Sequence, residues 1–295
     1  MMEGDSSITR RQLGRYLRDA RESVGMTLED AAKLMEWGKS SLQRIEKGMN
    51  QKIRIRDLDG LIEIYAIDDD RAAGLRGLAQ QAAGKSWWHE FGGLIPTNFN
   101  VYMGLESAAQ TMSSYQPDLV PGLLQTTDYA HVVARNAYPN DTEHDIAGRV
   151  RLKMGRQRKI TRRTKPAVLH VVLAETVLRR VIGGPAVMAA QLRHIADAST
   201  RPNITVRLLP LSAGCPTGEQ IGPFIIMEFG TDSRGAPEEP TIVYSEGFTS
   251  DMYSEKLSIV ERYTYAWQSL QRASLDEDLT RSLLRDKARE YERER

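Results

Sequence analysis

The sequence predicts an α+β protein, in which an N-terminal all-α bundle of five helices precedes a mixed α/β domain with a small sheet. Three observations lead to this prediction. Apolar residues recur at the helical spacing of three and four through residues 8–83. Short apolar runs typical of buried strands begin only beyond Pro166. The joint Gly84-Lys85-Ser86 lies between the two patterns, so we expect domains of residues 1–83 and 84–295.

The composition limits the class of protein. The chain has 295 residues, of which 41% are hydrophobic, and this is enough for two packed cores. Its net charge of +1 excludes a generic polyanion binder, so any nucleic-acid contact must come from a local patch. The single Cys215 excludes an internal disulfide and a Cys-rich metal site. Neither a long apolar run nor a signal-peptide core occurs, so we expect a soluble cytoplasmic protein with no membrane contact.

The first helix is predicted over residues 8–24, with Thr9 as its cap and Gly25 as its stop. Residues 26–48 then predict two short helices across a tight turn. Thr27 can cap the first of them, because its hydroxyl accepts from a free backbone N–H and Asp30 three places on can bond back. Gly38 opens the second, in which Leu42 and Ile45 are spaced to point inward.

The outer side of this second helix carries side chains that can recognise DNA. Arg44 can bond two guanine atoms at once, and Gln43 can pair with adenine. The side chains that we expect to contact bases are Lys39, Ser40, Gln43 and Arg44. Those that we expect to contact phosphates are Thr27, Ser41, Lys47, Lys52 and Arg54.

Around this helix the basic residues outnumber the acidic ones. Residues 39–56 hold one acid, Glu46, and six basic residues, which we name the cationic strip: Lys39, Arg44, Lys47, Lys52, Arg54 and Arg56. The alternative to DNA binding is an ordinary helical pair with a solvated basic face.

The run from Thr27 to Gly48 resembles the helix-turn-helix of the Xre/Cro/phage-repressor group. The residues that carry the resemblance are Thr27, Ala32, Leu42 and the closing Arg44-Ile45-Glu46-Lys47-Gly48. It implies a five-helix bundle that binds double-stranded DNA. Two residues depart from the pattern. The family usually has Gly at the position of Glu36 and Ser at the position of Gly38. Gly38 is a tolerated N-cap, but Glu36 disfavours the left-handed conformation expected in the turn.

Residues 55–67 and 68–83 predict the fourth and fifth helices. The three adjacent acids Asp68-Asp69-Asp70 are better explained as charges that stabilise the dipole at a helix start than as a metal cluster. Trp87, Trp88 and Phe91 follow the joint, and a domain interface explains them better than a ligand cage.

Beyond the joint, the chain resembles the large C-terminal domain of a family of actinomycete regulators. The segments that carry this resemblance are Trp87-Trp88, residues 104–106, 115–117 and 119–126, Gly183-Gly184-Pro185, and residues 191–194 and 202–206. In that family the domain follows an Xre-type helix-turn-helix, and members often occur with a small partner protein in an antitoxin-like pairing. The family domain has no secure biochemical assignment, so the resemblance identifies related proteins but does not indicate which ligand they bind.

The elements of the second domain are predicted from the spacing of apolar residues and from the turn residues between them. A helix over residues 102–112 leads to a turn at Pro121-Gly122. Strands are predicted over residues 168–173, 204–209, 224–229 and 241–244, and helices over 185–198, 254–272 and 275–291. The loop Ser212–Pro223 is a candidate rim of a pocket. We expect a mixed or antiparallel sheet.

A second basic run lies between Arg149 and Lys165. It holds no acid and nine basic residues: Arg149, Arg151, Lys153, Arg156, Arg158, Lys159, Arg162, Arg163 and Lys165. Ile146, Val150 and Met154 give the predicted helix a narrow apolar stripe, which leaves most charges outward. A second DNA-backbone contact, a dock for an acidic partner and a solvated helix face all stay open.

The sequence offers little for catalysis. The five histidines, His89, His131, His144, His170 and His194, lack metal-ligand spacing, and no phosphate loop or nucleophile elbow occurs. Cys215 with His170 is the one nucleophile and base pair to consider, and nothing places an oxyanion hole near it. We expect no enzyme activity, cofactor or metal.

The sequence therefore predicts a transcriptional regulator that binds a specific DNA sequence. We expect a homodimer on a palindromic site, with half-sites about one helical turn apart. An antitoxin-like protein that binds a small partner protein is the alternative, with DNA binding for autoregulation. A sensor of a small-molecule ligand is the next possibility.

Overall fold

The computed structural model describes residues 6–49, 52–67, 72, 75–76, 79, 91, 94, 97–231, 239–248 and 251–294. The chain divides into two compact units, Met1–Ala108 and Ala109–Arg295, and each is described by itself. The expected boundary after residue 83, the joint at 84–86, and Trp87 and Trp88 lie outside the described residues. The division into residues 1–83 and 84–295 therefore stays a prediction.

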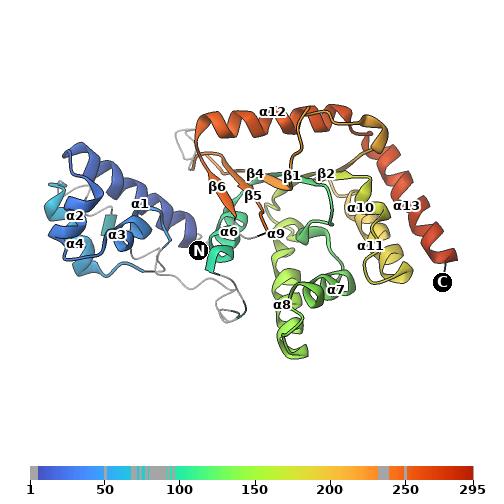
Figure 1. The fold of residues 1–295 in the computed structure, drawn as a ribbon, viewed down its shortest axis with the longest axis horizontal. Helices are drawn as coiled ribbons and strands as arrows, with labels where there is room; N and C mark the ends of the chain where they lie inside the picture. Colours follow the sequence, from blue (N-terminus) through green and yellow to red (C-terminus); the bar gives the residue numbers. More distant parts are fainter. Residues whose placement is uncertain are drawn as a thin grey trace. The chain divides into compact units, whose positions relative to one another are not determined.

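The first unit is helical. Its helices with described bounds are α1 (Ser6–Ser23), α2 (Leu28–Leu34), α3 (Lys39–Glu46), α4 (Ile55–Ile64) and α6 (Thr97–Ala108), of which the first four lie around one core in Figure 1. Helix α1 begins at Ser6, so Thr9 lies inside the helix and does not cap it as expected. Residues 72, 75–76 and 79 of the expected fifth helix are helical, and the rest of it, with Asp68–Asp70, lies outside the described residues.

The core of this unit is built from small and branched apolar residues at helical spacing. Leu17, Leu42, Leu58 and Leu61 are fully buried, one or two from each of α1, α3 and α4. Ala31 and Ala32 of α2 are buried among them, and their small size lets helices cross closely.

A left-handed residue follows the end of each of α1 to α4: Gly25, Glu36, Gly48 and Ala66. Between α2 and α3, the N–H of Glu36 donates to Lys33 O at 3.1 Å and that of Trp37 donates to Ala32 O at 2.8 Å. This is the Schellman pattern, which satisfies two helix-end carbonyls. Glu36 thus adopts φ 55° despite its side chain, so our expectation that it resists this conformation is wrong. The two hydrogen bonds offset a left-handed cost of about 1 to 2 kcal/mol.

The second unit holds a mixed six-stranded sheet in the order β3-β2-β1-β4-β5-β6. The strands are β1 (Thr111–Gln116), β2 (Val168–Ala174), β3 (Ile204–Leu209), β4 (Phe224–Glu228), β5 (Ile242–Ser245) and β6 (Met252–Ser254). Strands β1, β2 and β3 are parallel, whereas β4, β5 and β6 each run antiparallel to the preceding strand of that order. The structure confirms the α+β class and the four predicted strands, and it adds β1 and β6.

The strand β1 corrects one expected helix. The helix predicted over residues 102–112 ends at Ala108, because Met112 is buried in β1 between Leu169 of β2 and Met227 of β4.

Helices cover both faces of the sheet. They are η2 (Gly122–Leu124), α7 (Thr127–Ala137), α8 (Glu143–Arg156), α9 (Arg158–Thr161), α10 (Thr176–Arg179), α11 (Pro185–Ala198), η3 (Leu211–Ala213), α12 (Leu257–Ala273) and α13 (Glu277–Arg293). Figure 1 shows α12 along one face, with α7, α8 and α11 on the other. Trp267 and Leu270 of α12 pack on Tyr115, Phe224 and Val243. Among the described residues, no helix is both long and apolar enough to span a membrane.

Candidate nucleic-acid interface

The outer face of α3 is accessible over its whole length. The four side chains expected to contact bases, Lys39, Ser40, Gln43 and Arg44, are all exposed, and so is Ser41. Leu42 and Ile45 are buried, as their spacing predicts. The N-cap Gly38 makes no side-chain cap hydrogen bond, so the first backbone N–H groups of α3 keep their capacity for an anion.

The cap of α2 is a reciprocal capping box. Thr27 Oγ1 accepts from the Asp30 N–H at 3.2 Å, and the Thr27 N–H donates to Asp30 Oδ2 at 3.3 Å. Thr27 Oγ1 also donates to Asp30 Oδ2 at 2.6 Å. These bonds lower the pKa of the Asp30 carboxyl. Because a hydroxyl has one proton to donate, a phosphate at Thr27 would compete with Asp30 for it.

Lys39, at the start of α3, has a partner on α2. Its Nζ lies 3.2 Å from Glu29 Oε2, and both side chains are more than half exposed. Exposed pairs of this kind stabilise a protein by about 0 to 1 kcal/mol, so Lys39 can leave Glu29 for DNA at little cost.

The cationic strip lies at the surface. All six of its basic residues are exposed, including Lys47, Lys52 and Arg54, which we expect to hold phosphates. Its one acid, Glu46, is buried at 5% exposure. The exposed face of the strip is therefore more positive than its sequence suggests.

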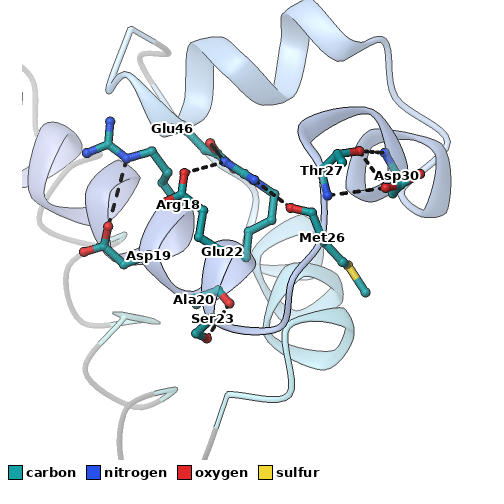
Figure 2. A network of polar contacts seen from close by, with 10 residues as sticks. Arg18, Asp19, Ala20, Glu22, Ser23, Met26, Thr27, Asp30 and Glu46 are labelled. Atoms are coloured by element: carbon teal, nitrogen blue, oxygen red, sulfur yellow. Dashed lines mark hydrogen bonds and ion pairs between the residues drawn. The ribbon is translucent and has the colours of Figure 1, made fainter.

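The carboxylate of Glu46 meets Arg21 of α1 in a buried bidentate pair. Arg21 Nε donates to Oε1 at 2.7 Å and Nη2 donates to Oε2 at 3.0 Å. Arg21 Nη1 also donates to the Met26 carbonyl at 2.8 Å, just before α2. Figure 2 shows this network around Glu46 and Met26, with the capping box of Thr27 and Asp30 beside it. One guanidinium thus ties together α1, the start of α2 and the end of α3.

Two glycines let the backbone of α1 approach the end of α3. A Cβ on Gly14 would lie 2.6 Å from the carbonyl oxygens of Ile45 and Glu46. A Cβ on Gly48 would lie 2.7 Å from the backbone of Arg11, and Gly48 also has φ 66°. Sequence reasoning missed both Arg21 and Gly14. The signal for Gly14 was an isolated glycine inside a helical pattern, which usually has a packing reason.

The hydroxyl of Tyr65 lies buried near the Arg21–Glu46 pair and has no hydrogen-bond partner among the described residues. Burial raises its pKa, and the negative charge of Glu46 adds to the shift. It therefore stays a neutral phenol that fills the space beside the pair.

The candidate nucleophile and base of the second unit form no hydrogen bond with each other. Cys215 Sγ is exposed and bonds within its own loop, to Glu219 O at 3.4 Å and Thr217 Oγ1 at 3.8 Å. His170 lies in β2, where burial lowers its pKa and Glu277 and Glu228 oppose that shift. Among the described residues, no group of three or more His, Cys, Asp and Glu could hold a metal ion.

The basic run from Arg149 to Lys165 does not form one surface. Five of its nine members are exposed: Arg151, Arg158, Arg162, Arg163 and Lys165. The other four turn partly or wholly inward, and Arg156 is only 9% exposed. Besides the expected stripe of Ile146, Val150 and Met154, α8 thus buries part of its basic side.

Two family models match the chain, one in each part of it. A family model described as "Domain of unknown function (DUF5753)" matches residues 99–286, which is more than half of the chain. A second model, described as "Helix-turn-helix domain", matches residues 12–75, which include α1 to α4. No curated protein and no solved structure gives a match.

Proposed function

Because the chain belongs to the family defined by the domain of unknown function DUF5753 and carries a helix-turn-helix domain before it, we propose that it is a transcriptional regulator that binds a specific DNA sequence. The observation that carries the proposal is the exposed outer face of α3, held from behind by the buried Arg21–Glu46 pair. The likeness to the Xre/Cro group and to actinomycete regulators supports the same role.

In this proposal α3 enters the major groove. Arg44 and Gln43 contact base edges in its centre, with Lys39 and Ser40 at its start. Ser41, Lys47, Lys52 and Arg54 hold the phosphates on either side, and Thr27 joins them when DNA displaces its bond to Asp30.

The proposal separates residues that recognise sequence from residues that only attract DNA. Arg44→Ala should cost about 1 to 3 kcal/mol on the cognate site and change little on random DNA. Lys52→Ala should weaken binding to every sequence and make the salt dependence of the affinity less steep. Selection of the genomic DNA fragments that the chain binds supplies the cognate site. Arg18→Ala, which removes a basic residue of α1, serves as the control. Equal weakening on cognate and random DNA after Arg44→Ala would leave Arg44 as a phosphate contact and remove the proposed readout.

We also propose that the second unit serves dimerisation and binds a partner or ligand. Large apolar side chains are exposed between β5 and β6 and on α12, since Phe248 is fully exposed, Leu257 is 71% exposed and Tyr265 is 65% exposed. Such residues favour a protein partner, which is a second copy in a homodimer or a small protein in the antitoxin-like alternative. Light scattering of the full chain at several concentrations, alone and with a neighbouring small protein, tests this proposal. A chain that stays monomeric and co-purifies with nothing would refute dimerisation and the protein partner.

We propose no catalytic role for the second unit. If Cys215→Ser changed DNA or partner binding, the thiol would need a function that this proposal does not give it.

A further inference from the structure

The exposed members of the second basic run make up a surface that we name the α8–α9 surface. It consists of five cationic side chains: Arg151, Arg158, Arg162, Arg163 and Lys165. Arg151 lies on α8 and Arg158 begins α9, whereas the other three lie at the end of α9 and in the turn after it. The four enclosed members of the run are not part of this surface.

Three of the five cations lie in one row. The backbone stays helical from α8 into α9, because Gln157 between them has φ −61° and ψ −19°. Arg151, Arg158 and Arg162 are seven and four residues apart, so they share one side of this helical segment. The row is about 16 Å long at the helical rise per residue. Because the phosphates of one DNA strand recur about every 3.4 Å along the duplex axis, a row of this length can meet several of them.

The turn that follows α9 is held in place by hydrogen bonds. Arg162 Nε donates to Lys165 O at 2.8 Å. Asn203 Nδ2, just before β3, donates to Ile160 O at 3.0 Å and to Ala167 O at 2.8 Å. The cations at this end of the surface therefore project from a fixed backbone.

The charges of the α8–α9 surface are not neutralised by the protein. In the part of the chain that the structure describes, none of the five cations forms an ion pair with an acid. Other arginines of the second unit do so even where at least half of the side chain is exposed. Six of these pair with a carboxylate: Arg179, Arg180, Arg193, Arg262, Arg285 and Arg289. Like charges close together repel, so an anionic partner would stabilise the α8–α9 surface.

The chemistry of this surface fits a nucleic-acid backbone better than a protein. Besides the cations, the exposed residues between Arg149 and Lys165 are Thr161 and Thr164, and no apolar or acidic side chain is exposed there. Protein interfaces place apolar and aromatic side chains at their centre. Contacts to a nucleic-acid backbone come from Arg, Lys and hydroxyl groups. The exposed side chains are of the second kind.

We propose that the α8–α9 surface binds the phosphate backbone of duplex DNA. This second contact adds affinity and does not change which sequence is preferred, because phosphates are the same in every sequence. The inference rests on the DNA binding proposed for the whole chain. It gives the second unit a role in DNA binding besides dimerisation and partner binding.

The combined substitution Arg151→Gln, Arg158→Gln and Arg163→Gln tests the proposal in the full chain. These three arginines make no hydrogen bond among the described residues, so the melting temperature should stay unchanged. Each phosphate contact contributes about 0.9 to the slope of log affinity against log salt concentration, so this slope should become less steep by about 2.7. At about 0.1 M salt the affinity should fall about 100-fold. The loss should be equal on cognate and random DNA.

A matched control removes the same charge elsewhere in the second unit. Arg262→Gln, Arg285→Gln and Arg289→Gln change α12 and α13, where each arginine already pairs with a carboxylate. The salt slope of this control should stay close to that of the unmodified chain. If the test variant has the same slope and affinity as the control, the proposal is wrong. Each single substitution of the test variant should also lower the slope by about 0.9, so the result does not depend on the folding of the triple variant.

Failure of this proposal differs from failure of the proposed function. Arg44→Ala should reduce the preference for the cognate site, whereas the test variant should keep that preference and weaken binding to all DNA. A chain that binds no DNA refutes both proposals. Polyglutamate serves as the probe for an acidic protein partner. If the test variant keeps the full salt slope on DNA but loses a binding of polyglutamate that the unmodified chain shows, the surface serves such a partner and the proposal is overturned.

Discussion

Replacing Glu46 by glutamine should loosen α3 without altering any side chain that we propose to contact DNA. Glu46 and Arg21 are 5% and 7% exposed, and two hydrogen bonds of 2.7 and 3.0 Å join them. Removing one charge from a buried pair costs about 3 to 5 kcal/mol, because the other charge stays buried without compensation. Glutamine keeps one acceptor and Arg21 keeps the Met26 carbonyl, so we expect the lower end, about 3 kcal/mol.

Amide hydrogen exchange in the full chain measures this loss where it occurs. Since about 1.4 kcal/mol corresponds to a factor of ten, the amides of α3 should exchange about 100-fold faster in Glu46→Gln. Glu22→Gln is the matched control, because Glu22 contacts the same arginine at 3.3 Å but its side chain is 60% exposed. That variant should cost at most about 1 kcal/mol.

The double variant Arg21→Met with Glu46→Leu tests whether the loss in Glu46→Gln comes from the charge left buried on Arg21. It leaves no buried charge, so it should recover most of the loss seen in Glu46→Gln. Exchange in α3 that is no faster in Glu46→Gln than in Glu22→Gln would refute the argument that this pair holds the helix.

Three further changes test the geometry around α3. Glu36→Gly should stabilise the first unit by about 0.5 to 1 kcal/mol, because glycine adopts φ 55° without strain; a lower stability in thermal or urea unfolding would contradict this. Gly14→Ala should destabilise it by about 1 to 3 kcal/mol and weaken DNA binding, since the new Cβ meets two backbone carbonyls at 2.6 Å; helix propensity alone gives the opposite sign. Thr27→Ala should raise the pKa of Asp30 toward its ordinary 3.8 in a carboxyl NMR titration, because that pKa is depressed by the Thr27 bonds; the capping bonds of the unmodified chain stabilise α2 above pH 3.8 and are lost as the pH falls through the folded pKa, and an unchanged Asp30 pKa would show that the capping box does not form in solution.

Burial and strand positions could be predicted from the sequence wherever the spacing of apolar residues within one helix or strand determined them. The inward positions Leu42 and Ile45 left Lys39, Gln43 and Arg44 exposed, because a short helix against a core has only one way to bury two apolar residues three apart. The strand β2 was predicted from a nearly continuous apolar run, as a central parallel strand covered by helices requires. The strand β3 was predicted from a run in which the buried Ile204, Val206 and Leu208 alternate with Thr205 and Arg207.

The strand β1 was missed for a related reason. Four of its six residues, TMSSYQ, are polar, yet it lies at the centre of the sheet with Ser114 only 1% exposed. A serine hydroxyl can be satisfied locally, here by accepting from Gln116 Nε2 at 3.1 Å, so a buried strand can tolerate it. No local pattern signals such a strand, because its neighbours β2 and β4 lie more than 50 and 100 residues further along the chain.

The buried pair was missed because its partners lie 25 residues apart. Its effect changes how the two basic stretches compare. By sequence, nine basic residues without an acid on residues 149–165 indicate a stronger surface than six with one acid on residues 39–56. In the structure the order reverses, because the acid of the first stretch is buried against Arg21 while all six basic residues stay exposed, and only five of the nine are exposed in the second. Charge attracts DNA only where it faces solvent, so the density of charge along the chain misjudged both surfaces. The first stretch is therefore the better place for a DNA backbone.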